Sequence, residues 1–303
     1  MLREEPIKAR GQMVVLDRVK DYAQLLKPNL SFMVVFSSVV GYLLAPNTTF
    51  EWKEVIILFA GGLLVTGGAN TINQILERYS DKLMKRTMYR PMPDGRMGAT
   101  EAWIFAALTG ITGALLLGYF FNPLAGLLSF TSLLLYAFAY TPMKKVHPVA
   151  VLIGAIPGAL PPLIGWVAAT NTLTGPLALG GWVLFLIQFF WQFPHFWAIA
   201  WVGFDDYEKA GIRMLPSKQG KTRFTGLQCM FYSLVLIPMA VMPRTVGISG
   251  NTGMLIGVAC GLLYFAASFV FYKNNDHKSA KRVMFSSFIY LPTVLLALLF
   301  DKM

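Results

Sequence analysis

The chain has 303 residues, of which 55% are hydrophobic and only 14% charged, and its formal net charge is +11. This composition excludes an ordinary soluble domain, because the apolar residues arrive in long blocks. The basic residues lie between those blocks and not in one domain, which argues against nucleic acid as a partner. We therefore expect a polytopic membrane protein.

The apolar blocks have the length that a helix needs to cross about 30 Å of hydrocarbon. Before them, Val15, Val19, Tyr22 and Leu26 form an apolar stripe, which predicts that residues 1–28 lie along the membrane interface. We predict one all-α membrane domain over residues 1–303, with about nine transmembrane helices at 30–44, 55–72, 102–121, 124–140, 149–169, 179–202, 227–242, 254–272 and 283–300.

The distribution of positive charge predicts the orientation. If the amino terminus is cytoplasmic, 23 of the 26 Lys and Arg fall on the inner side, and only Lys53, Arg244 and Lys302 fall outside. Inner loops of membrane proteins carry such an excess. We expect a bacterial cell (inner) membrane protein with its amino terminus in the cytoplasm, its carboxyl terminus outside and its functional loops on the cytoplasmic side.

The second apolar block leads directly into a charged segment, residues 73–91. Asn73, Glu77 and Asp81 are spaced four apart, so on a helix they share one face. Their oxygens are suited to a hard cation such as Mg²⁺, and neighbouring cations are suited to an anion. The combination predicts a site for a metal-bound diphosphate. The cations of the segment are Lys82, Lys85, Arg86 and Arg90.

The fifth block contains Pro157, Pro161 and Pro162 among glycines, and we expect this helix to be bent or interrupted and to line a cavity. In the sixth block, Gln188, Gln192 and His195 form a polar stripe on a helix that is otherwise rich in aromatic residues. Polar groups inside a span normally face the bundle interior, so the stripe is either a substrate contact or a hydrogen-bonded helix contact.

A second acidic pair, Asp205 and Asp206, follows the sixth block on the same side of the membrane. Two acidic clusters with Lys and Arg nearby suggest Mg²⁺ ions that bridge a diphosphate. The alternative is that juxtamembrane acids only neutralise local cations, and it is weaker for two clusters than for one. The predicted metal ligands, which we also expect to be the catalytic residues, are Asn73, Glu77, Asp81, Asp205 and Asp206.

These segments resemble the intramembrane polyprenyltransferase superfamily over nearly the whole chain. Residues 73–91 look like its first Asp-rich motif, and residues 205–216 look like its second. Within the superfamily, the strings 140–142, 161–166 and above all 191–197 (Trp-Gln-Phe-Pro-His-Phe-Trp) resemble the protoheme IX farnesyltransferases, or haem O synthases.

The resemblance implies a helical bundle around a central cavity that the two motif loops close. It also implies the reaction: Mg²⁺-assisted loss of diphosphate from farnesyl diphosphate, attack by a vinyl group of protohaem IX (haem B), and addition of water. The product, haem O, implies haem A synthase or terminal oxidase assembly as partners. Three residues are expected to contact haem, namely His195, Gln192 and Gln188. Eight residues are expected to bind diphosphate or the haem propionates, namely Arg78, Lys82, Lys85, Arg86, Arg90, Lys144, Lys145 and Lys209.

The chain departs from the superfamily pattern in two places. Glu77 stands where most relatives have Asp, and Trp201 and Val202 stand where many have an earlier acid of the second motif. The second motif is therefore expected to hold fewer metal contacts than the first. Two alternatives stay open: a related prenyltransferase with a quinone or chlorophyll-type acceptor, and a haem transporter or assembly protein without catalysis.

Overall fold

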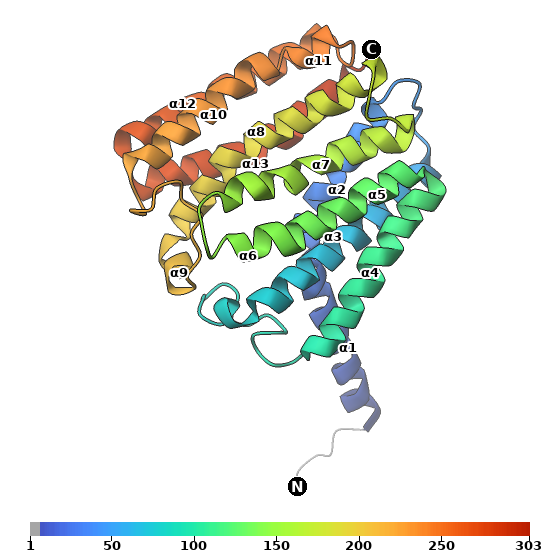
Figure 1. Cartoon of the computed structure of the whole chain (residues 1–303), viewed down its shortest axis with the longest axis vertical. Coiled ribbons are helices and arrows are strands. Elements are labelled where there is room, and N and C mark those ends of the chain that lie inside the picture. The colour runs from blue at the N-terminus through green and yellow to red at the C-terminus, as the bar shows by residue number, and fades with distance from the viewer. Residues whose placement is uncertain (1–6) are drawn as a thin grey trace.

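The computed structural model describes residues 7–303, with side chains from Asp17 onward, and the described chain is a bundle of helices (Figure 1). The predicted segment 1–28 therefore lies partly outside the described residues, and so does the side chain of Val15. The longer helices are α1 (Ile7–Leu26), α2 (Pro28–Leu44), α3 (Trp52–Asp81), α4 (Ala99–Phe120), α5 (Pro123–Leu134), α7 (Ala150–Thr170), α8 (Leu179–Val202), α10 (Arg223–Met239), α12 (Asn251–Asn274) and α13 (His277–Phe300).

Shorter elements complete the chain. A π-helical turn (Leu135–Tyr140) and α6 (Thr141–Met143) continue α5, and a 3₁₀ turn (Pro176–Ala178) precedes α8. The helices α9 (Phe204–Lys209) and α11 (Met242–Thr245) lie in loops. By length and hydropathy, eight segments of the described chain qualify as membrane spans, and α1 with α2, bent by 45°, makes a ninth if the pair is counted as one. The predicted all-α membrane bundle is confirmed.

The two ends of the bundle differ in what they carry. Helices α1, α6 and α9 lie at one end, whereas α11 and the carboxyl terminus lie at the other (Figure 1). Both acidic motifs and the loop after α6 therefore meet at the same end. Helix α3 continues beyond the predicted boundary at residue 72 and ends at Asp81, so the acidic part of the first motif, residues 73–81, is the last part of a long helix.

Helix α1 packs against the bundle through part of its apolar stripe. Leu25 is fully buried with Ile75, and the Tyr22 hydroxyl donates to Glu101 Oε1 at 2.7 Å. Val19 is 59% exposed. One side of α1 thus anchors the start of the chain to α3 and α4, and the other side stays free for a membrane surface.

The sequence predicts that this helix is bent or interrupted, and α7 is continuous from Ala150 to Thr170 despite its three prolines, so it is not interrupted. Pro161 and Pro162 have no N–H to offer the carbonyls four residues earlier. Side chains of neighbouring helices supply the missing donors: Ser132 Oγ lies 3.2 Å from the Pro157 carbonyl, and Gln188 Nε2 lies 2.8 Å from the Gly158 carbonyl. Buried backbone carbonyls need such partners, and here they tie α5 and α8 to α7.

The backbones of α2 and α7 approach very closely at two glycines. A Cβ at Gly165 would lie 1.8 Å from the Ser38 carbonyl oxygen, and one at Gly41 would lie 2.1 Å from the Pro162 carbonyl oxygen. Small residues permit such contacts between membrane helices. The contact holds α2, and the Lys27 residue that precedes it, at a fixed position against α7.

We expect Gly165→Ala to destabilise the protein by at least about 2 kcal/mol, because the methyl group has no space unless the two helices separate. Gly118→Ala is the matched control, since its Cβ would meet only the Gly126 Cα at 3.7 Å, and it should change stability by less than about 1 kcal/mol. Detergent unfolding curves followed by circular dichroism would measure both. Equal midpoints for the two variants would contradict the close contact.

Candidate active site

The first acidic motif lies on one buried face at the end of α3. Asn73, Glu77 and Asp81 are 2%, 3% and 1% exposed. Their spacing of four residues places them along a single helix face, as the sequence predicts. Buried carboxylates are very unfavourable without partners, so their surroundings must supply positive charge or a metal.

Each of the three side chains meets a cation from a different segment. Lys27 Nζ donates to Asn73 Oδ1 at 3.0 Å, Lys144 Nζ lies 2.5 Å from Glu77 Oε1, and Arg90 donates to Asp81 Oδ2 at 2.7 Å. We call these six residues the α3 charge cluster. It contains three cations and two carboxylates, so it has one positive charge in excess.

Lys27 is the member of the α3 charge cluster that sequence reasoning missed. It lies at the break between α1 and α2 and adopts a left-handed conformation, with φ 48° and ψ 65°. Such conformations are uncommon for residues other than glycine, and they concentrate at functional sites.

Lys144 reaches the α3 charge cluster from the end of the α5–α6 segment. The π-helical turn before it brings Tyr140 under its ammonium group, with Nζ 5.4 Å from the ring centre. Thr141 Oγ1 lies 3.2 Å from Asn73 Nδ2, which also donates to Glu77 Oε2 at 2.9 Å. Single π-turns of this kind are frequent at functional sites. The Tyr-Thr-Pro string of the sequence therefore faces the first motif.

The second acidic motif forms the short helix α9 and is much more open. The Asp205 side chain is 86% exposed, with Lys221 Nζ 3.8 Å from its Oδ1, and Asp206 is half-buried. Within the described residues, no three Asp, Glu, His or Cys side chains are grouped as a metal site would require. The structure thus places the first three predicted ligands, Asn73, Glu77 and Asp81, on one buried face. That they bind a metal together with Asp205 and Asp206 stays a prediction.

One contact connects the loops of the two motifs, and another connects the second motif loop to the loop after α6. Arg86, from the first motif loop, donates to the Tyr207 hydroxyl at 3.3 Å, and the Arg213 N–H donates to the Lys144 carbonyl at 2.7 Å. The second loop is therefore fastened to both segments that surround the α3 charge cluster.

The other predicted anion-binding residues are placed less closely. The Arg78 guanidinium lies over the Tyr79 ring, 4.5 Å from its centre, so it is engaged locally. Four lysines of the loops are exposed, namely Lys82, Lys85, Lys145 and Lys209. Of the eight predicted basic residues, the structure brings Arg90 and Lys144 to the buried carboxylates and Arg86 to the second motif.

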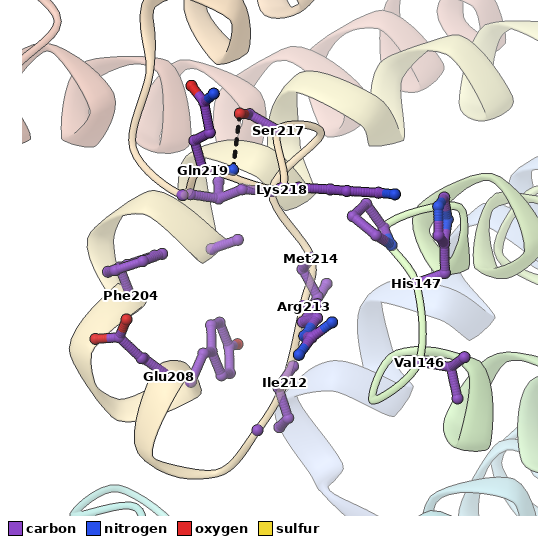
Figure 2. A pocket seen from close by; sticks show the side chains of 16 residues that line it. Val146, His147, Phe204, Glu208, Ile212, Arg213, Met214, Ser217, Lys218 and Gln219 are labelled. Carbon is purple, nitrogen blue, oxygen red and sulfur yellow. Dashed lines mark hydrogen bonds between the residues drawn. The ribbon is translucent and has the colours of Figure 1, made fainter.

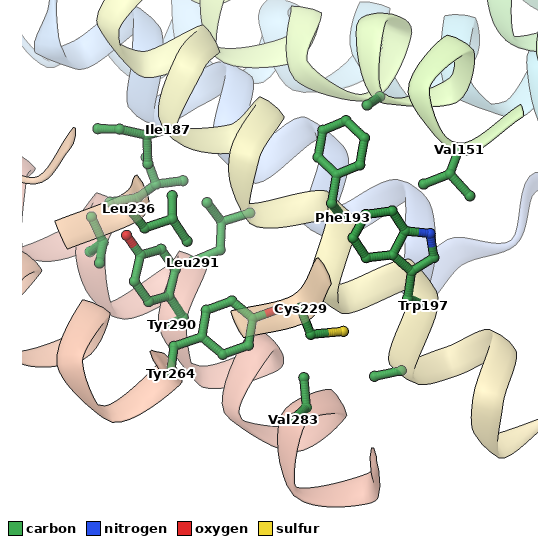
Figure 3. Packing of buried hydrophobic residues seen from close by; sticks show 14 of the residues in the cluster. Val151, Ile187, Phe193, Trp197, Cys229, Leu236, Tyr264, Val283, Tyr290 and Leu291 are labelled. Carbon is green, nitrogen blue, oxygen red and sulfur yellow. The ribbon is translucent and has the colours of Figure 1, made fainter. Parts of the chain in front are cut away.

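The polar stripe of α8 faces other helices. Gln188 Nε2 donates to the Gly158 carbonyl at 2.8 Å, and Gln192 Nε2 donates to the Ala155 carbonyl at 3.2 Å. On neighbouring positions, Phe193 and Trp197 belong to the apolar core shared with α10, α12 and α13 (Figure 3). Both glutamines thus bind α8 to α7, and Gln188 Oε1 has no hydrogen-bond partner among the described residues.

His195 is buried at the contact between α8 and α13. Its Nδ1 lies 2.7 Å from Ser287 Oγ, which also lies 2.5 Å from the Met284 carbonyl oxygen. The Trp191 ring stacks on the imidazole, with 4.6 Å between ring centres. The haem contact predicted for His195, Gln192 and Gln188 stays a prediction.

The chain matches known proteins over most of its length. The model of the UbiA prenyltransferase family matches residues 34–291. A protein named protoheme IX farnesyltransferase from Cytophaga hutchinsonii is 46% identical over 284 residues, which cover 93% of this chain and 97% of the relative. One of the same name from Flavobacterium psychrophilum is 39% identical over 289 residues, covering 93% and 94%.

Solved structures resemble the fold at low sequence identity. A digeranylgeranylglyceryl phosphate synthase has a TM-score of 0.77 at 22% identity and covers 94% of this chain and 98% of its own. A UbiA homologue from Archaeoglobus fulgidus, bound to GPP and Mg²⁺, has a TM-score of 0.63 at 15% identity and covers 92% and 99%. At these identities the likeness establishes the fold alone.

Proposed function

The chain belongs to the UbiA prenyltransferase family, and from this premise we propose that it transfers a farnesyl group from farnesyl diphosphate to a vinyl group of protohaem IX, with addition of water, to give haem O. The names of the relatives supply the two substrates. The observation that carries the proposal is the α3 charge cluster, in which buried oxygen ligands and cations lie side by side.

The donor set of the cluster fits Mg²⁺. One amide and two carboxylates supply oxygen atoms on a single helix face, and all three side chains are buried at its end. Mg²⁺ prefers oxygen ligands and is commonly held by one or two carboxylates together with substrate phosphates. Asn73, Glu77 and Asp81 would hold the ion, and Asp206 and Asp205 would contribute from the second motif. When bound, Mg²⁺ neutralises charge on the departing diphosphate.

The cations of the cluster provide the rest of the diphosphate site. Lys27, Lys144 and Arg90 approach the same helix face from three segments, and their excess positive charge favours an anion. Fixed charges stabilise a leaving group most effectively where water is excluded, and Lys144 and the two carboxylates are buried. Ionisation of an allylic diphosphate needs no covalent nucleophile from the protein, and none is assigned.

The orientation of the chain is part of the proposal. The excess of Lys and Arg on the motif side supports a cytoplasmic amino terminus, an external carboxyl terminus and residence in the cell inner membrane. Helix α1 and the carboxyl terminus lie at opposite ends of the bundle, which agrees with an odd number of spans (Figure 1). The product would then pass to haem A synthase or to terminal oxidase assembly.

We expect the purified, detergent-solubilised protein to convert protohaem, in the presence of farnesyl diphosphate and Mg²⁺, to a haem that is heavier by a farnesyl group plus a hydroxyl group. Chromatography with mass spectrometry would identify it. Chelation by EDTA should abolish the product and added Mg²⁺ should restore it, because the leaving group then regains its counter-charge. Unchanged haem together with prenylation of an aromatic acceptor would contradict the haem assignment.

A further inference from the structure

A cavity of about 570 Å³ opens beside α9, between the loop after α6 and the loop after α9 (Figure 2). This volume lies within the range of about 300–1,000 Å³ that small-molecule sites occupy. Its apolar wall includes Ala200, Phe204 and Met214. None of the residues that sequence reasoning assigned to the metal, the diphosphate or the haem lines it.

The polar residues of the cavity are mostly cationic or hydrogen-bond donors. Arg213 and Lys218 come from the loop after α9, and His147 comes from the opposite wall. The Lys218 side chain extends across the cavity toward His147, whereas Glu208, the acidic residue among the lining side chains, lies at the far edge (Figure 2). The side near His147 therefore favours an anion.

The hydrogen bonding of His147 defines what this residue can offer. The Val149 N–H donates to His147 Nδ1 at 3.1 Å, so Nδ1 is an acceptor and the proton of the neutral ring is on Nε2. A histidine in this tautomer can donate from Nε2 to an anionic oxygen. It cannot use Nε2 as an iron ligand without losing the Val149 contact.

The second motif loop connects the cavity to the surroundings of the α3 charge cluster. Tyr207 lines the cavity, and its hydroxyl accepts from Arg86 of the first motif loop at 3.3 Å. Arg213 lines the cavity too, and its N–H donates to the carbonyl of Lys144, the partner of Glu77. A ligand in the cavity therefore lies outside the proposed diphosphate site and is connected to it through Arg213 and Lys144.

We propose that this cavity binds the propionate carboxylates of the haem acceptor, through Arg213, Lys218 and His147. The inference rests on the proposed function. Protohaem carries its propionates on one side of the macrocycle and its vinyl groups on the other, so anchoring the carboxylates here leaves the vinyl side free to face the prenyl donor. The apolar wall suits a porphyrin edge, and the position at the loop end keeps the carboxylates near water.

The test uses the full-length protein and compares two paired variants. Arg213→Gln/Lys218→Gln removes both cavity cations, and Lys278→Gln/Arg282→Gln removes the same charges from exposed positions at the start of α13. Haem affinity would be measured by absorbance titration, with haem and with haem dimethyl ester. We expect about tenfold weaker haem binding in the cavity variant, since two partly exposed ion pairs are lost, and no change in the control.

Further measurements distinguish propionate from diphosphate as the bound anion, and distinguish failure of the cavity site from failure of the proposed function. The dimethyl ester should bind the wild type and the cavity variant equally, and the KM for farnesyl diphosphate should be unchanged. A raised KM for farnesyl diphosphate with unchanged haem affinity would assign the cations to diphosphate and overturn the propionate site. If the wild type is active and binds haem as tightly as the cavity variant does, the propionate site is wrong and the proposed function stands.

If the wild type binds haem through these cations but does not prenylate it, only the proposed function is wrong. If it neither binds haem in this way nor prenylates it, both proposals are wrong.

Discussion

Replacing Asp81 with asparagine is expected to lower the rate of farnesyl transfer by about 1,000-fold or more. Asp81 is 1% exposed and pairs with Arg90 at 2.7 Å, so its charge acts inside the buried α3 charge cluster. Asparagine keeps the volume but removes the anionic ligand. A loss of about 4 kcal/mol of transition-state stabilisation, which is in the range of metal-ion effects, corresponds to this factor. Single-turnover formation of the farnesylated haem would measure it.

The control for this variant is Asp94→Asn in the same loop. Asp94 is exposed and pairs with Arg96, away from the buried face of α3, and its loss should leave the rate within about twofold because exposed ion pairs contribute little. Asp81→Asn also leaves Arg90 without its partner, so Asp81→Asn/Arg90→Gln should recover stability without recovering activity. Turnover by the folded Asp81→Asn protein at the wild-type rate would remove Asp81 from the proposed metal site.

The sequence alone was sufficient for features that repeat along one helix. The apolar blocks predicted the spans, because a chain in hydrocarbon must form its backbone hydrogen bonds within helices. The observed spans differ from the predicted ones mainly in where they begin and end. The spacing of Asn73, Glu77 and Asp81 predicted a common face, and that face is buried as one unit. Both results depend only on the helical repeat.

Contacts between distant segments could not be read in this way. Lys27 meets Asn73 across 46 positions, and Arg86 meets Tyr207 across 121. No periodicity links such pairs, since helix packing decides which loops meet. The prolines of α7 illustrate the same limit. They predicted a bend or an interruption, and the helix is continuous, with Gln188 and Ser132 bonded to the carbonyls that the prolines leave free. Those donors are identifiable only after α5, α7 and α8 are assembled.

The second motif should be sensitive to substitution at Asp206 and much less so at the neighbouring Asp205. Asp206 is half-buried on α9, whereas the Asp205 side chain is 86% exposed. Burial strengthens the interaction of a carboxylate with a bound cation, because less water screens it. We expect Asp206→Asn to lower turnover by about 100-fold or more, and Asp205→Asn by less than about tenfold, with folding unchanged.

Measuring the two variants at several Mg²⁺ concentrations would distinguish a ligand from a residue that only shapes the loop. If Asp206 helps to hold the metal, its variant should need more Mg²⁺ for half-maximal rate, because each lost carboxylate weakens metal affinity. A loop effect would lower the rate at every Mg²⁺ concentration by the same factor. Equal losses for Asp205→Asn and Asp206→Asn would contradict the order that their exposure predicts, and would indicate that α9 turns toward the α3 charge cluster when diphosphate binds.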